Sequence, residues 1–160
     1  MEFKIIEERL NGLDPIVSDG LEFTPVFGYG SKKDLMAHLR SERKDGDSYY
    51  PLVWLMTPFK TDGDYFATGR AEAEVDLIIA TLTSRDISNK ERVRITFENT
   101  LEPLLENVVA RLRTGGGTSV QDGIFNVEKF FGYDTDSSNA ASDVWDAITL
   151  QIKIKIKYIC

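Results

Sequence analysis

The stretch from Trp145 to Cys160 constrains the fold more than any other part of the chain. One parity of this stretch carries apolar side chains, namely Ile148, Leu150, Ile152, Ile154, Ile156 and Tyr158, and the other carries Thr149, Gln151, Lys153, Lys155 and Lys157. Successive side chains of a strand point to opposite faces, so the alternation predicts a long β-strand with one apolar and one basic face. Parallel strands are usually apolar on both faces, which favours an antiparallel sheet here, with helices over the apolar side.

Composition predicts one soluble domain that spans residues 1–160. Of its residues, 42 % are hydrophobic and 28 % are charged, as is ordinary for a soluble globular protein. A chain of this length can bury a sufficient hydrophobic core without the help of disulfides or structural metals. Its net charge of −7 argues against general nucleic-acid binding, which needs cations to replace counterions. The single cysteine, Cys160, cannot form an internal disulfide, and we expect a reducing compartment.

The sequence also predicts that the protein does not enter a membrane. The first ten residues carry charges throughout, so no signal peptide is evident. The apolar stretch 49–59 holds two prolines and is too short to span a bilayer.

Apolar residues at spacings of three and four predict helices over 3–13, 32–43 and 88–113. Ser31 and Ser88 are suitable N-caps for the second and third of these helices. Pro103 lies inside the third and should kink it or split it in two. The glycines at 115–117 should end it.

The remaining apolar runs predict strands, at 49–57, 72–83 and 124–133. Both parities of 72–83 are apolar, so that strand should be central. Residues 22–28 should form an edge strand or an extended loop because they include Pro25. Loops are expected at 14–20, 41–48 and 134–142.

A long connection, about 58–71, separates the strands 49–57 and 72–83. Most hairpin loops have two to five residues. We therefore expect this segment to be either disordered or an arm that contacts another molecule.

No catalytic, cofactor or metal site is expected from the sequence. His38, the only histidine, lies in a predicted helix with no supporting motif, so a surface or packing role is favoured. The glycines at 115–117 follow a helix, whereas a phosphate loop precedes one. The close aspartate pairs at 45/47, 62/64 and 134/136 lack the further ligands of a calcium loop and should be turn residues.

The basic stripe of Lys153, Lys155 and Lys157 allows three interpretations. It could contact nucleic-acid backbone, protect a sheet edge from pairing, or form ion pairs with an acidic partner such as another copy of the chain. The sequence alone leaves all three open.

The order of these elements resembles that of the small tail-terminator, or tail-completion, proteins of tailed bacteriophages and related neck ring proteins. The resemblance rests on this order, on the stretch YPLVWL at 50–55 followed by a long loop and an alternating strand, and on the late strand that begins at Trp145. It implies an α/β fold of the α+β kind, with a mostly antiparallel sheet flanked by helices. It also implies a non-enzymatic ring at the head–tail junction of the virion, which caps or joins the tail, binds other neck or tail proteins and lets DNA pass through its lumen.

Head-to-tail rings need two different patches on each subunit. The arm could be one patch, and the exposed edge of a sheet, such as the end of strand 145–159, could receive a neighbour by strand addition. The expected interface residues are Phe59, Asp62, Asp64, Tyr65, Phe66, Arg70, Lys153, Lys155 and Lys157. Two alternatives are a soluble α+β binding domain of a bacterial cytoplasmic protein and an enzyme that uses carboxylates.

Overall fold

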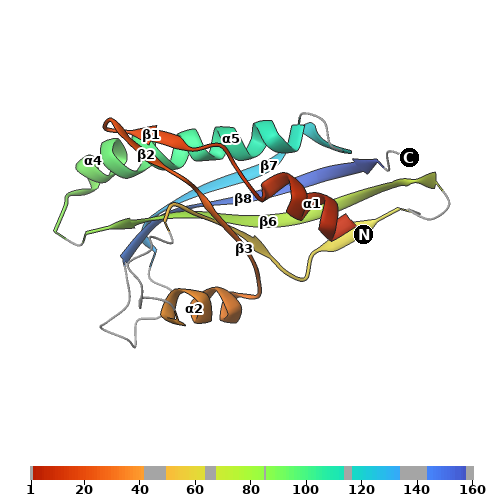
Figure 1. Ribbon diagram of the computed structural model, residues 1–160, viewed down its shortest axis with the longest axis horizontal. Coiled ribbons are helices and arrows are strands. Elements are labelled where there is room, and N and C mark those ends of the chain that lie inside the picture. The colour runs from red at the N-terminus through yellow and green to blue at the C-terminus, as the bar shows by residue number, and fades with distance from the viewer. Residues whose placement is uncertain are drawn as a thin grey trace.

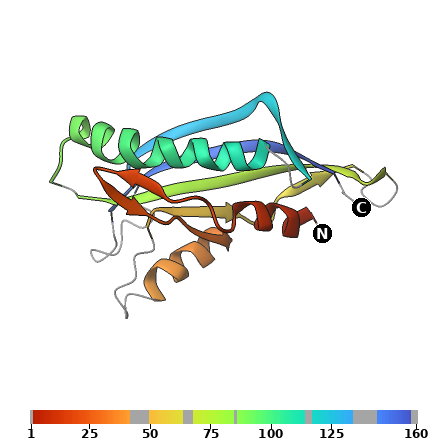
Figure 2. The same cartoon turned by 45° about the horizontal axis from the view of Figure 1, so that its top comes forward.

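The computed structural model describes residues 2–41, 50–63, 68–84, 86–113, 117–133 and 144–157. In this part of the chain, helices lie on both faces of a six-stranded sheet (Figures 1 and 2). The predicted α+β fold, with a mostly antiparallel sheet flanked by helices, is confirmed. The predicted loops at 41–48 and 134–142 lie almost entirely outside the described residues.

The final strand lies inside the sheet and not at its edge. The strands are β3 (Val26–Gly30), β4 (Leu52–Met56), β5 (Lys60–Asp62), β6 (Arg70–Thr83), β7 (Thr118–Tyr133) and β8 (Val144–Lys157). Their order is β3-β4-β6-β8-β7, with β5 paired to the same side of β6 as β4. Only β3 and β4 are parallel to each other. β6 is central, as predicted, and β3 is an edge strand that begins just after Pro25.

The apolar parity of β8 forms the main core, as the alternation predicts. Ile148, Leu150, Ile152, Ile154 and Ile156 are all buried there. Two helical elements cover this face of the sheet: α1 (Glu2–Leu10) and the long helix that contains α5 (Glu102–Arg113). Strands β6 and β8 extend past the end of α5 (Figure 1).

The sequence predicted that Pro103 would kink the long helix or split it in two, and the helix is not split there. It runs from α4 (Asn89–Arg92) through the π-helix η1 (Val93–Leu101) into α5. At the junction the amide of Glu102 donates to the carbonyl of Phe97, five residues back. The missing amide of Pro103 therefore falls where the five-residue turns of η1 give way to the four-residue turns of α5.

A capping box starts the long helix at Ser88, one of the predicted caps. The amide of Glu91 donates to Ser88 Oγ at 3.3 Å, and the amide and hydroxyl of Ser88 donate to the Glu91 carboxylate at 3.0 and 2.9 Å. These two bonds from Ser88 lower the pKa of Glu91 from its usual 4.5. Ser31 and Asp34 start α2 (Lys32–Ser41) in the same way, and the hydrogen bonds from Ser31 lower the pKa of Asp34.

The lowered pKa makes the cap sensitive to acid. A carboxylate whose pKa is lower in the folded state stabilises the fold above its unfolded pKa, and this stabilisation is lost as pH falls through the folded pKa. Wild type should therefore be more stable than Glu91→Gln at pH 7 in urea denaturation, and the difference should shrink as pH falls below 4.5. A difference that stays constant as the pH falls would contradict this role of the cap.

A smaller core lies on the other face, beneath α2. Leu35, Leu52, Trp54, Ile78 and Trp145 are among its buried members. The indole nitrogen of Trp54 donates to the carbonyl of Gly30 at 3.1 Å, which fixes the ring against β3. His38 packs its ring 5.5 Å from that of Trp54, which agrees with the packing role favoured from the sequence.

The predicted loop at 14–20 is wrong, because a small hairpin occupies this segment. Strand β1 (Ile16–Ser18) pairs with β2 (Leu21–Phe23) around a turn in which Asp19 and Gly20 have φ of 50° and 79°. Two consecutive positive φ values are typical of a type I′ turn. The hairpin lies against η1, where the Asn99 side chain donates to Asp19 Oδ1 at 3.2 Å.

Candidate functional site

A cleft of about 890 Å³ lies at the end of the sheet where β5, β6, β7 and β8 meet. Its lining includes Asp62, Arg70, Glu72, Ser119, Lys155 and Lys157. Four of these are residues that the sequence placed in a subunit interface. Asp62 and Arg70 come from the expected arm, and Lys155 and Lys157 come from the basic stripe. The fold thus brings together side chains that are up to 95 positions apart in the sequence (62 to 157).

Two of the other expected interface residues, Lys153 and Phe59, do not line the cleft. Lys153 is two residues further into β8, and Phe59 is half-buried, with its ring 6.3 Å from that of Phe3 in α1. Asp64, Tyr65 and Phe66 lie outside the described residues. Part of the expected arm is strand, since β5 pairs with residues 72–74 of β6.

Strand addition to β8 is ruled out along its described length. β8 pairs with β6 from Val144 to Lys157, and with β7 on its other side as far as Ile156. Lys157 also donates its backbone amide to the Gly117 carbonyl at 2.6 Å. The idea that the lysines protect a free edge is wrong for the same reason, because β8 has no free edge there.

Within the chain, two of the three lysines face carboxylates on β6. Lys153 is the cross-strand partner of Glu74, and Lys155 that of Glu72, with an Nζ–Oε1 distance of 3.8 Å in the second pair. Opposite charges at directly opposed positions stabilise an antiparallel pair. The stripe is therefore partly neutralised by its own sheet.

The last row of the sheet breaks this pattern, because Lys157 lies opposite Arg70. The amide of Lys157 points to β7, which makes its pairing with Arg70 one of the closely spaced, non-hydrogen-bonded kind, about 4.5 Å between Cα atoms. Two cationic residues at directly opposed positions thus line the cleft. Both side chains are exposed, and no ion pair joins either of them to another described residue.

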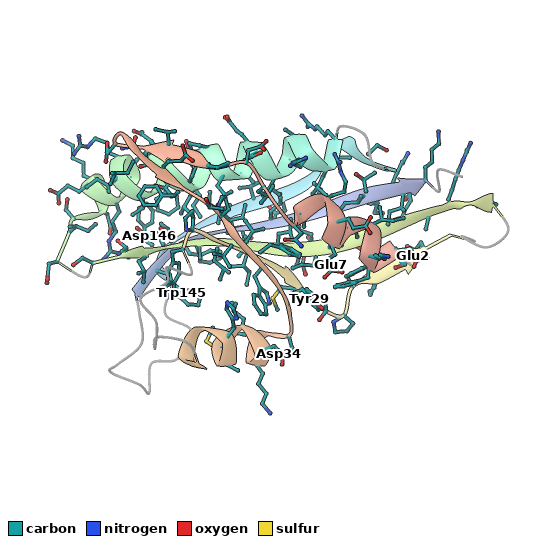
Figure 3. All side chains as sticks on the ribbon, in the orientation of Figure 1. Glu2, Glu7, Tyr29, Asp34, Trp145 and Asp146 are labelled. Atoms are coloured by element: carbon teal, nitrogen blue, oxygen red, sulfur yellow. The ribbon has the colours of Figure 1, made fainter. Side chains whose placement is uncertain are left out.

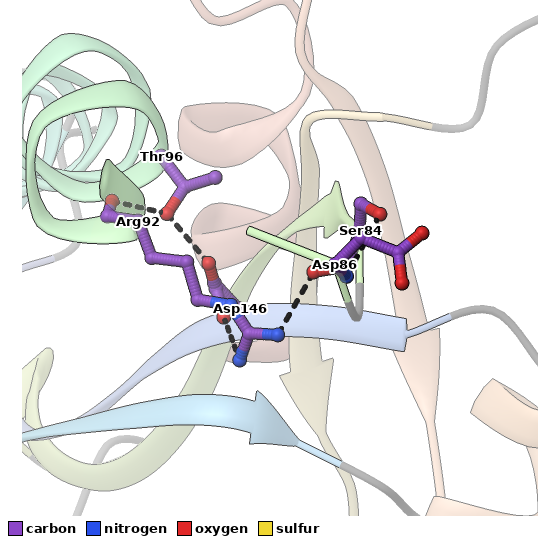
Figure 4. A network of polar contacts seen from close by, with 5 residues as sticks. All are labelled: Ser84, Asp86, Arg92, Thr96 and Asp146. Atoms are coloured by element: carbon purple, nitrogen blue, oxygen red, sulfur yellow. Dashed lines mark hydrogen bonds and ion pairs between the residues drawn. The ribbon is translucent and has the colours of Figure 1, made fainter. Parts of the chain in front are cut away.

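A buried polar cluster lies at the opposite end of the sheet (Figures 3 and 4). Asp146 of β8 has no exposed surface, accepts a hydrogen bond from Thr96 Oγ1 at 2.6 Å, and lies 3.8 Å from Arg92 Nη1. The Arg92 guanidinium also donates to the Ser84 carbonyl at 2.8 Å. The cluster joins the start of the long helix to β8. No local sequence pattern predicts this cluster.

The described residues offer no candidate metal site beside the cleft and the buried polar cluster. No group of three or more His, Cys, Asp or Glu side chains there could hold a metal ion. No helix in the same part of the chain is long and apolar enough to cross a membrane.

No protein-family model matches the sequence, and no curated protein matches it either.

Proposed function

We propose that this chain is a structural protein without enzymatic activity that works by associating with copies of itself. The observation that carries this proposal is that two unlike patches lie at opposite ends of the sheet. A head-to-tail ring needs such a pair, because each subunit offers one patch and receives the other. The charged cleft around Arg70 is the first patch.

The second patch consists of apolar side chains on the β1–β2 hairpin and on η1, the element against which the hairpin lies. Val17 is exposed by 67 % and Leu21 by 63 % on the hairpin, and Val93 and Ile95 are exposed on η1. Exposed apolar side chains on adjoining elements are typical of protein–protein contacts.

The setting we propose is the neck or tail end of a tailed-bacteriophage virion, where such rings bind other neck or tail proteins. The order of elements supports this setting, and the net charge of −7 suits a lumen through which DNA slides without being held. The alternative is a soluble α+β binding domain of a bacterial cytoplasmic protein. The cleft volume favours it, since small-molecule sites measure about 300–1,000 Å³.

Light scattering across a range of concentrations, with negative-stain images, tests the proposal. We expect a closed ring whose mass is a multiple of 18.1 kDa. Deletion of residues 60–69 should abolish the ring and leave a folded monomer, because β6 keeps its pairing with β4 and β8. Circular dichroism checks that the deletion variant is folded. A wild-type monomer at every concentration, or a ring that survives the deletion, would contradict this assembly.

A further inference from the structure

We propose that Arg70 and Lys157 bind a phosphate dianion in the cleft at the end of the sheet. The inference does not rest on self-association, because the site is complete within one chain. It starts from the charges of three successive cross-strand rows on the polar face.

Of these three rows, two pair opposite charges between β6 and β8 and the last pairs like charges. Glu74 faces Lys153 in the first row and Glu72 faces Lys155 in the second, so each cation has an anion directly opposite. In the third row Arg70 faces Lys157. Like charges at directly opposed positions destabilise a sheet, and here they sit at the closer of the two antiparallel spacings.

The carboxylates that line the cleft do not relieve this repulsion. Glu72 already forms an ion pair with Lys155, with 3.8 Å between Oε1 and Nζ. Asp62 lies directly opposite Glu72, one row away from Arg70, and forms no ion pair with it. The row of Asp62, Glu72 and Lys155 therefore contains charges of both signs, whereas the row of Arg70 and Lys157 contains cations alone. Uncompensated local conflicts of this kind are typical of binding sites.

The geometry fits a tetrahedral dianion better than a carboxylate. A single carboxylate offsets one charge, whereas a phosphate near neutral pH offsets most of two. Arg70 offers a planar fork of donors and Lys157 a compact ammonium. The exposed hydroxyl of Ser119, opposite Lys155 on β7, lies on the same polar face and offers a further donor. The phosphate could be free or carried as the monoester of a small molecule.

Thermal unfolding in different anions at equal ionic strength tests this site. Phosphate should raise Tm above its value in chloride, by roughly 4–7 °C at about twenty times the dissociation constant. Acetate should give a smaller rise. Glycerol phosphate should act like phosphate if the site takes monoesters, and should have no effect if the site takes only the free ion.

Variants that remove one or two of these cations test the site in a second way, through their Tm in phosphate and in chloride. The double variant Arg70→Gln/Lys157→Gln should lose the phosphate shift, while its Tm in chloride should rise by roughly 1–3 °C because the repulsion is gone. Lys153→Gln removes a cation that faces Glu74, so it should lower Tm slightly in chloride and keep the phosphate shift. A wild type without a phosphate-specific shift, or a double variant that retains it, would overturn the proposal.

Discussion

Replacing Asp146 with alanine is expected to lower the free energy of unfolding by about 3–5 kcal/mol. Asp146 has no exposed surface, and Arg92, 3.8 Å away, is only 8 % exposed. Alanine would leave the Arg92 charge buried without its carboxylate, and the Thr96 hydroxyl would keep only the Arg92 carbonyl as an acceptor. Urea denaturation of the two proteins measures the loss.

The control for this loss is Asp76→Ala, which removes an exposed aspartate opposite Gln151 on β6. It should change stability by no more than about 0.5 kcal/mol. Asp146→Asn keeps an acceptor for Thr96 but loses the charge, so its cost should fall between the two. If Asp146→Ala costs less than about 1 kcal/mol, the cluster does not anchor the long helix to β8.

The second large effect is expected at Gly28, where alanine should cost about 2–3 kcal/mol. A Cβ atom there would lie 2.5 Å from Cζ3 and 2.7 Å from Cε3 of Trp54. The ring cannot move aside freely, because it is buried and its indole nitrogen bonds to the Gly30 carbonyl. Urea denaturation gives the cost, and a change in tryptophan fluorescence should accompany it.

A double-mutant cycle separates this clash from a general effect of alanine in β3. In a Trp54→Leu background the smaller side chain leaves room for the new methyl group, so Gly28→Ala should cost much less there. An equal cost in both backgrounds would show that the Trp54 ring is not the obstacle.

Local patterns were enough to predict most of the sheet and the helix starts. The alternation in β8, the two apolar parities of β6, and the caps at Ser31 and Ser88 all depend on neighbours within a few residues. The β1–β2 hairpin was missed although Asp19-Gly20 is a strong turn signal, because strands of three residues are too short to show a period.

The candidate site could be predicted only in part. The sequence identified Arg70 and the lysine stripe as candidate interface residues. It did not predict that β8 lies between two strands, which removed the explanation based on a free edge. The pairing of Arg70 with Lys157 depends on a register between distant segments, which no local pattern encodes. The partner of Asp146 was hidden for the same reason, since Thr96 lies 50 positions earlier in the chain.

The position of β8 also has a consequence for how the chain reaches its native state. β6 and β7 do not pair with each other and share β8 as their common neighbour, which follows both of them in the sequence. Until residues 144–157 have left the ribosome, one side of β6 has no hydrogen-bonding partner and its apolar surface stays accessible. Contacts of such long range close slowly and leave intermediates prone to aggregation. We therefore expect truncation within β8 to yield insoluble protein, whatever assembly the complete chain enters.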